Sequence, residues 1–245
     1  MRRSGPGAPV SGPERRLRWA VPGAGGPGPR RRVGRPSSWN RRTGARVDTG
    51  DIEAIGTGRL VLEPLAVAHA DEMAGVLGDP ALHAFIGGAP LSARDLRARY
   101  ERLTAGCPDP AGTWWNWVIR LRAEGCLVGT VQATLTVSGS GSTTAEVAWV
   151  VGTPWQGRGI ASEAARALVG RLRERGAAAV RAHVHPDHAA SAAVAAAAGL
   201  SPTEHRHDGE VRWETGPVRP GARTAPGGGS GRASGPAGRV RPAPE

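Results

Sequence analysis

The clearest chemical signal in this 245-residue chain is the segment 150–161, Val-Val-Gly-Thr-Pro-Trp-Gln-Gly-Arg-Gly-Ile-Ala. An apolar strand leads into a glycine-containing loop, and the loop opens a helix. The first N–H groups of a helix lack partners within it, and the helix dipole favours negative charge there. Gly157 and Gly159 let a ligand approach the backbone, and Arg158 can add a charge-assisted bond. The segment therefore predicts a phosphate or pyrophosphate site.

The same spacing also suits a tight strand-to-helix connection that binds nothing. No Gly-Lys-Ser/Thr follows the loop, which excludes a P-loop of the Walker type. The third glycine of the dinucleotide-binding fingerprint is missing as well, and the unit follows a run of strands. The segment alone therefore leaves two readings: a loop that binds a phosphate group, or a connection that binds no ligand.

Histidines form a second candidate cluster. His183 and His185 share one face of an expected strand, and His188 is close in sequence with Asp187 beside it. No cysteine or further carboxylate completes a tetrahedral ligand set, so we expect no metal site. His205 and His207 are expected in a surface loop.

The elements that position these residues are read from periodicity. Strands are expected at 59–65, 115–121, 126–137, 143–151, 178–184 and 210–215, and helices at 69–77, from Ser92 onward, 160–175 and 189–198. Three strands joined by short loops predict an antiparallel meander, and the strand–helix–strand unit that follows predicts a parallel crossover. The fold class is therefore α/β, with a mixed sheet and helices on both faces.

Charge and composition divide the chain into three parts. Residues 1–50 hold 12 arginines against two acids, residues 216–245 hold five against one, and residues 51–215 hold 15 against 18. Glycine and proline are concentrated in the two terminal parts. We expect disordered tails at 1–57 and 216–245 around one domain at 58–215. The tails are interpreted as solvated extensions, with nucleic-acid attraction as the alternative.

The expected cellular location depends on two segments that the sequence lacks, a membrane span and a targeting signal. No apolar run approaches the roughly 20 residues that span a bilayer, and no cleavable targeting segment is evident. The only cysteines, Cys107 and Cys126, fit a reduced cytoplasmic protein or form a single bridge.

Three motifs resemble one known family. Gln156-x-x-Gly159-x-Ala161 matches the Gln/Arg-x-x-Gly-x-Gly/Ala signature of the GNAT superfamily of acetyl-CoA-dependent N-acetyltransferases. Residues 143–151 resemble the family's fourth strand. Residues 185–200 resemble its second motif, Asn-x-x-Ser-x-x-Val before Gly-Phe.

The first expected strand adds a finer likeness. Residues 59–65, Arg-Leu-Val-Leu-Glu-Pro-Leu, resemble the opening strand of the branch that includes the ribosomal-protein N-terminal acetyltransferases. In all, the resemblance covers about residues 58–215, the whole expected globular part.

The resemblance implies how acetyl-CoA would bind. The family's fourth and fifth strands, here 143–151 and 178–184, splay apart, and the pantetheine arm lies between them. Main-chain groups of the fourth strand would pair with that arm, and loop N–H groups would hold the pyrophosphate. His188 stands where relatives have an asparagine near the pantetheine. The implied cofactor-binding residues are Trp149, Val150, Val151, Gln156, Gly157, Arg158, Gly159, Ile160, Ala161 and His188.

Two residues are candidates for the chemistry of acetyl transfer. A protonated amine needs a base, and Glu146 interrupts an apolar strand, where desolvation would raise the pKa of a carboxyl. The alternative is that Glu146 faces solvent or pairs with an arginine. Relatives place a tyrosine acid after the second motif, but Ala195 stands there and the only tyrosine is Tyr100. Ser191 or water would then serve the leaving thiolate.

The predicted function is transfer of an acetyl group from acetyl-CoA to a primary amine, either a protein N-terminus or a small molecule, by direct attack in a ternary complex. The slightly acidic central part favours cationic amines. The alternatives are a catalytically inactive CoA-binding module and a nucleic-acid binder that works through its arginine-rich tails. The acceptor's identity and the oligomeric state are not encoded in any motif.

Overall fold

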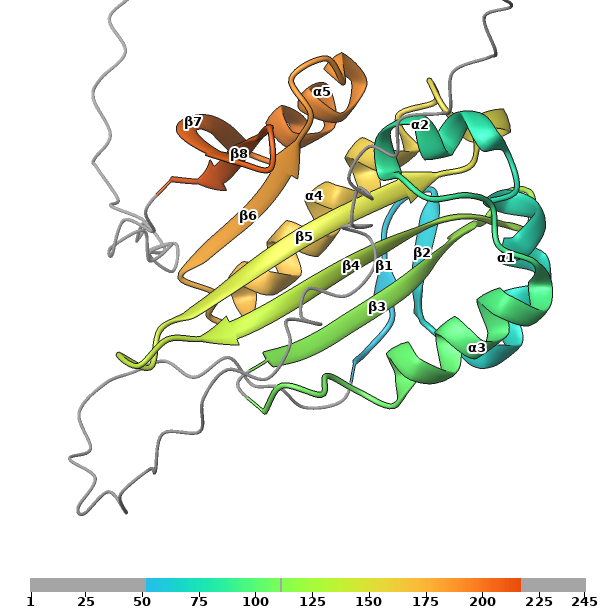
Figure 1. Ribbon diagram of the computed structural model, residues 1–245, viewed down its shortest axis with the longest axis horizontal. Coiled ribbons are helices and arrows are strands. Elements are labelled where there is room, and N and C mark those ends of the chain that lie inside the picture. Colours follow the sequence, from blue (N-terminus) through green and yellow to red (C-terminus); the bar gives the residue numbers. More distant parts are fainter. Residues whose placement is uncertain (1–51, 111, 217–245) are drawn as a thin grey trace, which may run out of the picture.

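An eight-stranded mixed sheet lies at the centre of the computed structural model, which describes residues 52–110 and 112–216 (Figure 1). Its strand order is β1-β2-β3-β4-β5-β6-β8-β7. The strands are β1 (Ile55–Gly56), β2 (Leu60–Pro64), β3 (Gly112–Leu121), β4 (Leu127–Val137), β5 (Thr143–Val151), β6 (Ala179–Val184), β7 (Leu200–His207) and β8 (Glu210–Thr215).

The predicted meander and crossover are both present. Strands β2 to β5 pair antiparallel in chain order, and β5 then pairs parallel with β6 through the crossover helix. The α-helices are α1 (Ala70–Val76), α2 (His83–Ile86), α3 (Ala93–Thr104), α4 (Ile160–Glu174) and α5 (Ala189–Ala197); three short 3-10 turns are η1 (Val67–His69), η2 (Pro80–Leu82) and η3 (Thr153–Trp155).

Helices cover both faces of the sheet, as predicted. On one face α4 buries Ile160, Leu168 and Leu172 against the larger apolar cluster, which includes Trp115 and Trp117 of β3. Each such fully buried side chain contributes about 1.5–3 kcal/mol. Trp115 and Trp117 are therefore core residues.

On the other face, α1 and α3 enclose a smaller cluster. Met73 and Leu96 pack there against Val118 of β3 and Leu127 of β4. The helix expected from Ser92 onward is α3, and Ser92 caps it, because its Oγ accepts a hydrogen bond from Asp95 N at 3.1 Å. Two separate apolar clusters thus pack against the sheet from both sides.

Two predicted boundaries need correction. β1 pairs with β2 and lies ahead of Gly58, so the folded part begins earlier than expected. Residues 200–207 form strand β7, in which His205 and His207 lie, rather than a surface loop. The sequence hides this strand because it is an edge strand, exposed along most of its length and paired only with β8. Its Pro202 also weakens the strand pattern.

Some predictions concern residues beyond the described part. Most of the tails expected at 1–57 and 216–245, namely residues 1–51 and 217–245 with their arginine clusters, lies outside the described residues. Cys107 and Cys126 are both free thiols, so the single bridge is not formed. Among the described residues, no helix has the length and apolar character that a membrane crossing requires.

Candidate active site

Strands β5 and β6 separate after a short stretch of pairing. Their parallel register includes only three pairs, and the last joins Glu146 to Arg181. β5 continues to Val151 and β6 to Val184, so the facing edges of both strands lose their partner beyond this point. An unpaired strand edge carries a row of free N–H and C=O groups. The splayed pair predicted from the sequence is therefore present.

A cavity lies where the two strands part. Its walls come from residues 146–150 of β5 and residues 182–185 at the end of β6, and α2 contributes Phe85 and Ile86. We call this the strand cavity. Glu146 and Glu210 give its lining two carboxylates, and none of the described residues that line it is an arginine. The space can therefore receive a cationic group.

The glycine loop leads from the end of β5 into α4. Gly157 and Gly159 have φ of +72° and +73°, values that L side chains rarely adopt. A Cβ built on Gly157 meets no atom within 4 Å, so the loop leaves open space above its backbone. Because the first N–H groups of a helix have no intrahelical acceptor, those of Ile160 and Ala161 are available beside this space. An anionic group such as pyrophosphate fits here.

A second cavity, of about 470 Å³, lies over this loop, and we call it the loop cavity. It is bounded by the end of β5, the first turn of α4, helix α5 and the segment 81–86. It shares six lining residues with the strand cavity: Phe85, Ile86, Trp149, Val150, His188 and Ser191. The two cavities therefore adjoin, and a long ligand can reach from the loop to the splay.

Arg59 and Glu163 brace the loop from outside. Arg59 Nε donates to Glu163 Oε2 at 2.7 Å, and Arg59 Nη1 donates to the carbonyl of Arg158 at 3.0 Å. Thr57 Oγ1 donates to Glu163 Oε1 at 2.6 Å. Burial would raise the pKa of Glu163, but the bonds from Thr57 and Arg59 outweigh it and lower that pKa. The carboxylate thus stays charged and ties α4 to the chain ahead of β2.

Two predicted binding residues point their side chains at the protein. Gln156 Nε2 donates to the carbonyl of Val151 at 3.0 Å, which closes the loop on the end of β5. Arg158 Nη2 donates to Glu124 Oε1 at 2.7 Å, on an exposed surface. Gln156 still lines the loop cavity, whereas Arg158 is not among its lining residues. The Arg158 guanidinium, expected to bind the ligand, is instead paired with Glu124.

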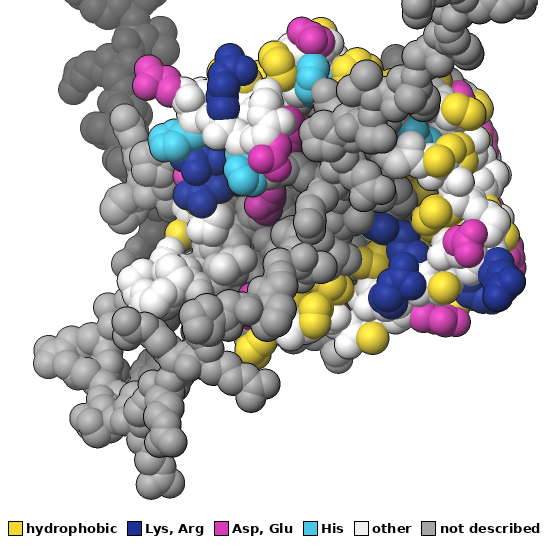
Figure 2. Space-filling view, viewed as in Figure 1, with side chains coloured by type: hydrophobic (Ala, Val, Ile, Leu, Met, Phe, Trp, Pro, Cys, Tyr) yellow, Lys and Arg dark blue, Asp and Glu magenta, His cyan; other side chains and the backbone are white. Residues whose placement is uncertain are grey.

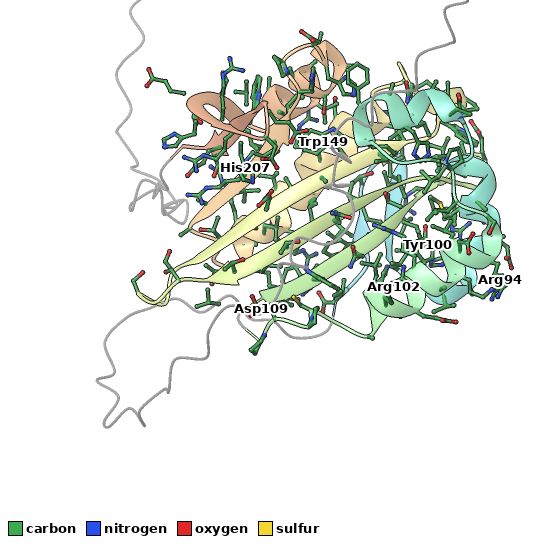
Figure 3. The ribbon with its side chains drawn as sticks, in the orientation of Figure 1. Arg94, Tyr100, Arg102, Asp109, Trp149 and His207 are labelled. Carbon is green, nitrogen blue, oxygen red and sulfur yellow. The ribbon has the colours of Figure 1, made fainter. Side chains whose placement is uncertain are left out.

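Trp149 bridges the splay on the helix side. Figure 3 shows this residue between β5 and α5. Its Nε1 donates to Ser191 Oγ at 3.1 Å, and its indole packs on the larger apolar cluster. Both residues line both cavities. Ser191 therefore lies at the junction of the two cavities.

His188 faces α2 across the cavities. Its ring stacks on Phe85 with centroids 4.1 Å apart. Burial, and secondarily the charge of His185, lowers the pKa of His188. The imidazole is therefore held in its neutral form, in which one ring nitrogen donates and the other accepts a hydrogen bond.

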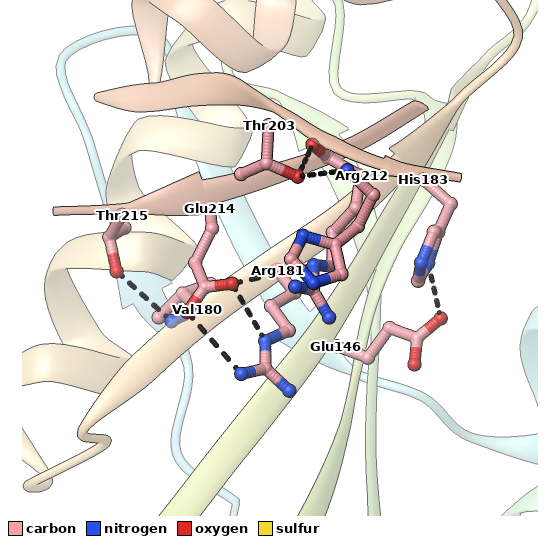
Figure 4. A network of polar contacts seen from close by, with 9 residues as sticks. Glu146, Val180, Arg181, His183, Thr203, Arg212, Glu214 and Thr215 are labelled. Carbon is pink, nitrogen blue, oxygen red and sulfur yellow. Dashed lines mark hydrogen bonds and ion pairs between the residues drawn. The ribbon is translucent and has the colours of Figure 1, made fainter. Parts of the chain in front are cut away.

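The surroundings of Glu146 differ from the expected apolar environment. Its side chain is 46% exposed, and Oε1 lies 2.8 Å from Nδ1 of His183. The expectation was wrong because the β5 face that carries Glu146 lines the strand cavity, whereas the opposite face is in the core. Figure 4 shows the carboxylate and the imidazole facing each other across the gap between β5 and β6.

No side chain that could act as a general acid stands where relatives of the family carry a tyrosine. Ala195 is fully buried in the larger cluster. Tyr100 lies in the smaller cluster, on the same sheet face as Glu146, and its hydroxyl is buried. It is not among the described residues that line either cavity.

Several residues of the site were missed from sequence. Arg59 and Glu163 lie about 100 positions apart, and only the fold brings them together. Phe85, whose ring stacks on His188, belongs to none of the sequence motifs. His183 was weighed only as a metal ligand; among the described residues, no group of three candidate ligands can hold a metal ion.

Comparison with known proteins identifies the family. Residues 59–201 match the model of the acetyltransferase (GNAT) domain, which is more than half of the chain. No curated protein matches the sequence.

Solved structures share the fold at low sequence identity. A GNAT-family acetyltransferase from Bacillus anthracis superposes with a TM-score of 0.54 at 19% identity, over 66% of this chain and 96% of that one. A ribosomal-protein alpha-N-acetyltransferase, RimL, in complex with coenzyme A gives 0.55 at 17%, over 66% and 97%. A putative ribosomal-protein-serine acetyltransferase from Vibrio cholerae gives 0.52 at 17%, over 70% and 99%. The chain belongs to the GNAT family and is an acetyl-CoA-dependent acetyltransferase.

Proposed function

We propose that this protein transfers the acetyl group of acetyl-CoA to a primary amine, either a small molecule or a protein N-terminus. The observation that carries the proposal is the pair of adjoining cavities between the glycine loop and the strand splay. A ligand with a diphosphate at one end and a reactive group at the other matches this arrangement. Acetyl-CoA supplies the activated acyl group as a thioester.

The residues that would hold acetyl-CoA follow from the cavity walls. Backbone N–H groups of 157–161 would take the pyrophosphate, since glycine φ values leave them uncovered. The free edge of residues 149–151 would pair with the amide-bearing arm as an added strand does. His188 would offer a ring nitrogen beside that arm. These contacts position the thioester at the splay, and positioning lowers the barrier for attack.

The acceptor would enter the strand cavity from the side of α2. Glu146 and Glu210 give that cavity negative charge, which attracts a cationic amine. Neither Cys107 nor Cys126 lines either cavity, which favours direct attack by the amine over an acyl-cysteine intermediate. Both free thiols also fit the proposed cytoplasmic location.

Turnover with amines tests the proposal. The protein is incubated with acetyl-CoA and a panel of polyamines, amino sugars, aminoalkyl compounds and peptides with free N-termini. The expected result is amine-dependent release of free CoA, with the mass of one acetyl group added to the acceptor. Initial rates should give intersecting double-reciprocal lines, as a ternary complex requires. Parallel lines would contradict direct attack.

One observation supports a second candidate, a CoA-binding module without catalysis. Ala195 stands where relatives carry their tyrosine acid, and Tyr100 is buried elsewhere. This alternative predicts acetyl-CoA binding by calorimetry with no turnover on the whole amine panel. Turnover with any amine would remove it.

A further inference from the structure

Deprotonation of the amine needs a base of suitable strength, and Glu146 alone is not well placed for this task. A carboxylate becomes a useful base near neutral pH when burial disfavours its charged form and so raises its pKa. An exposed carboxylate keeps much of its hydration and lacks this effect. Glu146 is 46% exposed. A base works best when its affinity for protons matches the working pH. Imidazole meets this condition without burial, because its ordinary titration lies near about pH 6.5.

The strand cavity holds such an imidazole in contact with Glu146. His183 Nδ1 lies 2.8 Å from Glu146 Oε1, and the His183 side chain is only 12% exposed. With the carboxylate charged, Nδ1 carries the proton and donates it to Oε1. Nε2 is then the unprotonated nitrogen. Within the described residues Nε2 has no hydrogen-bond partner, and His183 lines the strand cavity.

We infer that His183 is the catalytic residue that accepts the amine's proton on Nε2, and that Glu146 is a positioning residue that fixes its tautomer and orientation. This inference rests on the proposed function. A carboxylate that holds the Nδ1 proton favours the charged imidazolium when it forms. Glu146 therefore acts through His183 rather than on the amine itself.

The proton balance of the transfer is complete without a further reactant. The C–N bond of the amide forms and the C–S bond of the thioester breaks. Of the two protons that an ammonium acceptor loses, one passes to His183 Nε2 and then to solvent. Ser191 or water donates a proton to the sulfur, to give free CoA, and takes up the amine's second proton in its place.

Other charged groups surround His183 and must be separated from it experimentally; Figure 2 shows histidine, arginine and acidic side chains gathered on this part of the surface. On β7 the ring of His207 has its centroid 5.8 Å from that of His183. On β8, Arg212 is the cross-strand partner of His183, and Glu210 lines the same cavity. Arg181 precedes it on the same face of β6, and His185 lies just past the end of the strand. The Arg181 guanidinium is engaged with Glu214, with Nε 3.0 Å from Oε2 (Figure 4).

Isosteric variants distinguish a base from a structural histidine. His183→Asn keeps a donor near the Nδ1 position and removes Nε2, so it retains the bond to Glu146 but not the proton acceptor. We expect His183→Asn to lower kcat/KM by about 10²–10³-fold and to abolish the acidic limb of its pH profile. Glu146→Gln should lower kcat/KM less, and the double variant should be no worse than His183→Asn alone.

Control variants and binding measurements accompany these rates. His205→Asn, in exposed β7, should leave kcat/KM and its pH profile unchanged. His207→Asn should keep the acidic limb, which separates the neighbouring ring from His183. Calorimetry should give wild-type acetyl-CoA affinity for His183→Asn. Activity of His183→Asn within threefold of wild type, with the limb retained, overturns the inference while the proposed function stands.

A measurement without turnover covers the case in which no amine on the panel reacts. Nitrogen-15 NMR of the imidazole rings, with His183→Asn for assignment, reports the tautomer directly. The expected result at neutral pH is a protonated Nδ1 in wild type and a shift toward the Nε2-protonated form in Glu146→Gln. A protonated Nε2 in the neutral wild-type ring overturns the inference. Absence of turnover alone would count against the proposed function.

Discussion

Trp149 Nε1 donates a hydrogen bond of 3.1 Å to Ser191 Oγ, and this bond ties the free part of β5 to helix α5. Because the serine oxygen accepts from the indole, its own proton is directed elsewhere. No described residue accepts that proton. The hydroxyl is therefore poised to donate at the junction of the two cavities, where a thiolate would leave.

Removal of the Ser191 hydroxyl is expected to slow transfer without weakening cofactor binding. Ser191→Ala should lower kcat by about three- to thirtyfold, since a hydrogen bond to a charged group contributes about 1.5–3 kcal/mol and water replaces part of it. Ser201→Ala, in exposed β7, is the control. Equal kcat values for Ser191→Ala and wild type would exclude the donor role.

Gly157 should be required for cofactor affinity rather than for folding. Gly157→Ala places a Cβ in the open space over the loop at φ of +72°, and Gly209→Ala imposes the same strain at φ of +84°, also in open space. Both should lose about 1–2 kcal/mol of folding stability. Only Gly157→Ala should weaken acetyl-CoA binding, by about tenfold or more. Equal affinities measured by calorimetry would show that no ligand approaches this backbone.

The brace that Arg59 and Glu163 form outside the loop should also contribute to acetyl-CoA affinity. Arg59→Met removes the bonds to Glu163 and to the Arg158 carbonyl, so the loop loses its fixed position. We expect acetyl-CoA affinity to fall about three- to tenfold, with a small drop in Tm. Arg97→Met breaks an exposed pair with Asp71 and is the matched control, expected to change neither quantity. A wild-type affinity for Arg59→Met would mean that the loop is held without it.

Stability should fall as acid titrates His188. Because the folded state holds the pKa of His188 below its ordinary value, the unfolded chain binds its proton first. The free energy of unfolding is therefore full above about pH 6.5 and decreases as pH falls through that value toward the lower folded pKa. His188→Phe keeps the stack on Phe85 and should reduce this slope in denaturant titrations.

A residual slope is expected in that variant, because burial also lowers the pKa of His69. His205→Phe, outside both cavities, should leave the slope unchanged. A slope in His188→Phe as steep as in wild type would contradict the assignment.

Local patterns were enough to predict most of the fold. The meander, the crossover helix α4 and the cap at Ser92 all depend on near-neighbour periodicity and short turns, which a sequence displays directly. Strand β7 escaped because its stability comes from pairing with β8 and not from its own polar residues. The brace between Arg59 and Glu163 escaped for a similar reason, since it joins positions about 100 apart.

The site was only partly predictable. The glycine loop was found because its chemistry lies within one continuous segment. The environment of Glu146 was not predicted. A two-residue alternation shows which residues share a face of the strand, but it does not show whether that face lies against the core or a cavity. His183 could have been found as its partner from one further fact, the parallel register that pairs Glu146 with Arg181 and so brings His183 just past the last pair.

A crystal structure of the protein with coenzyme A would show directly whether the glycine loop and the strand splay hold the cofactor. The predicted result is a diphosphate within hydrogen-bond distance of the N–H groups of residues 157–161, with the sulfur between β5 and β6 close to Ser191. Coenzyme A bound at another surface, or a complex in which β5 and β6 pair along their whole length, would contradict the account.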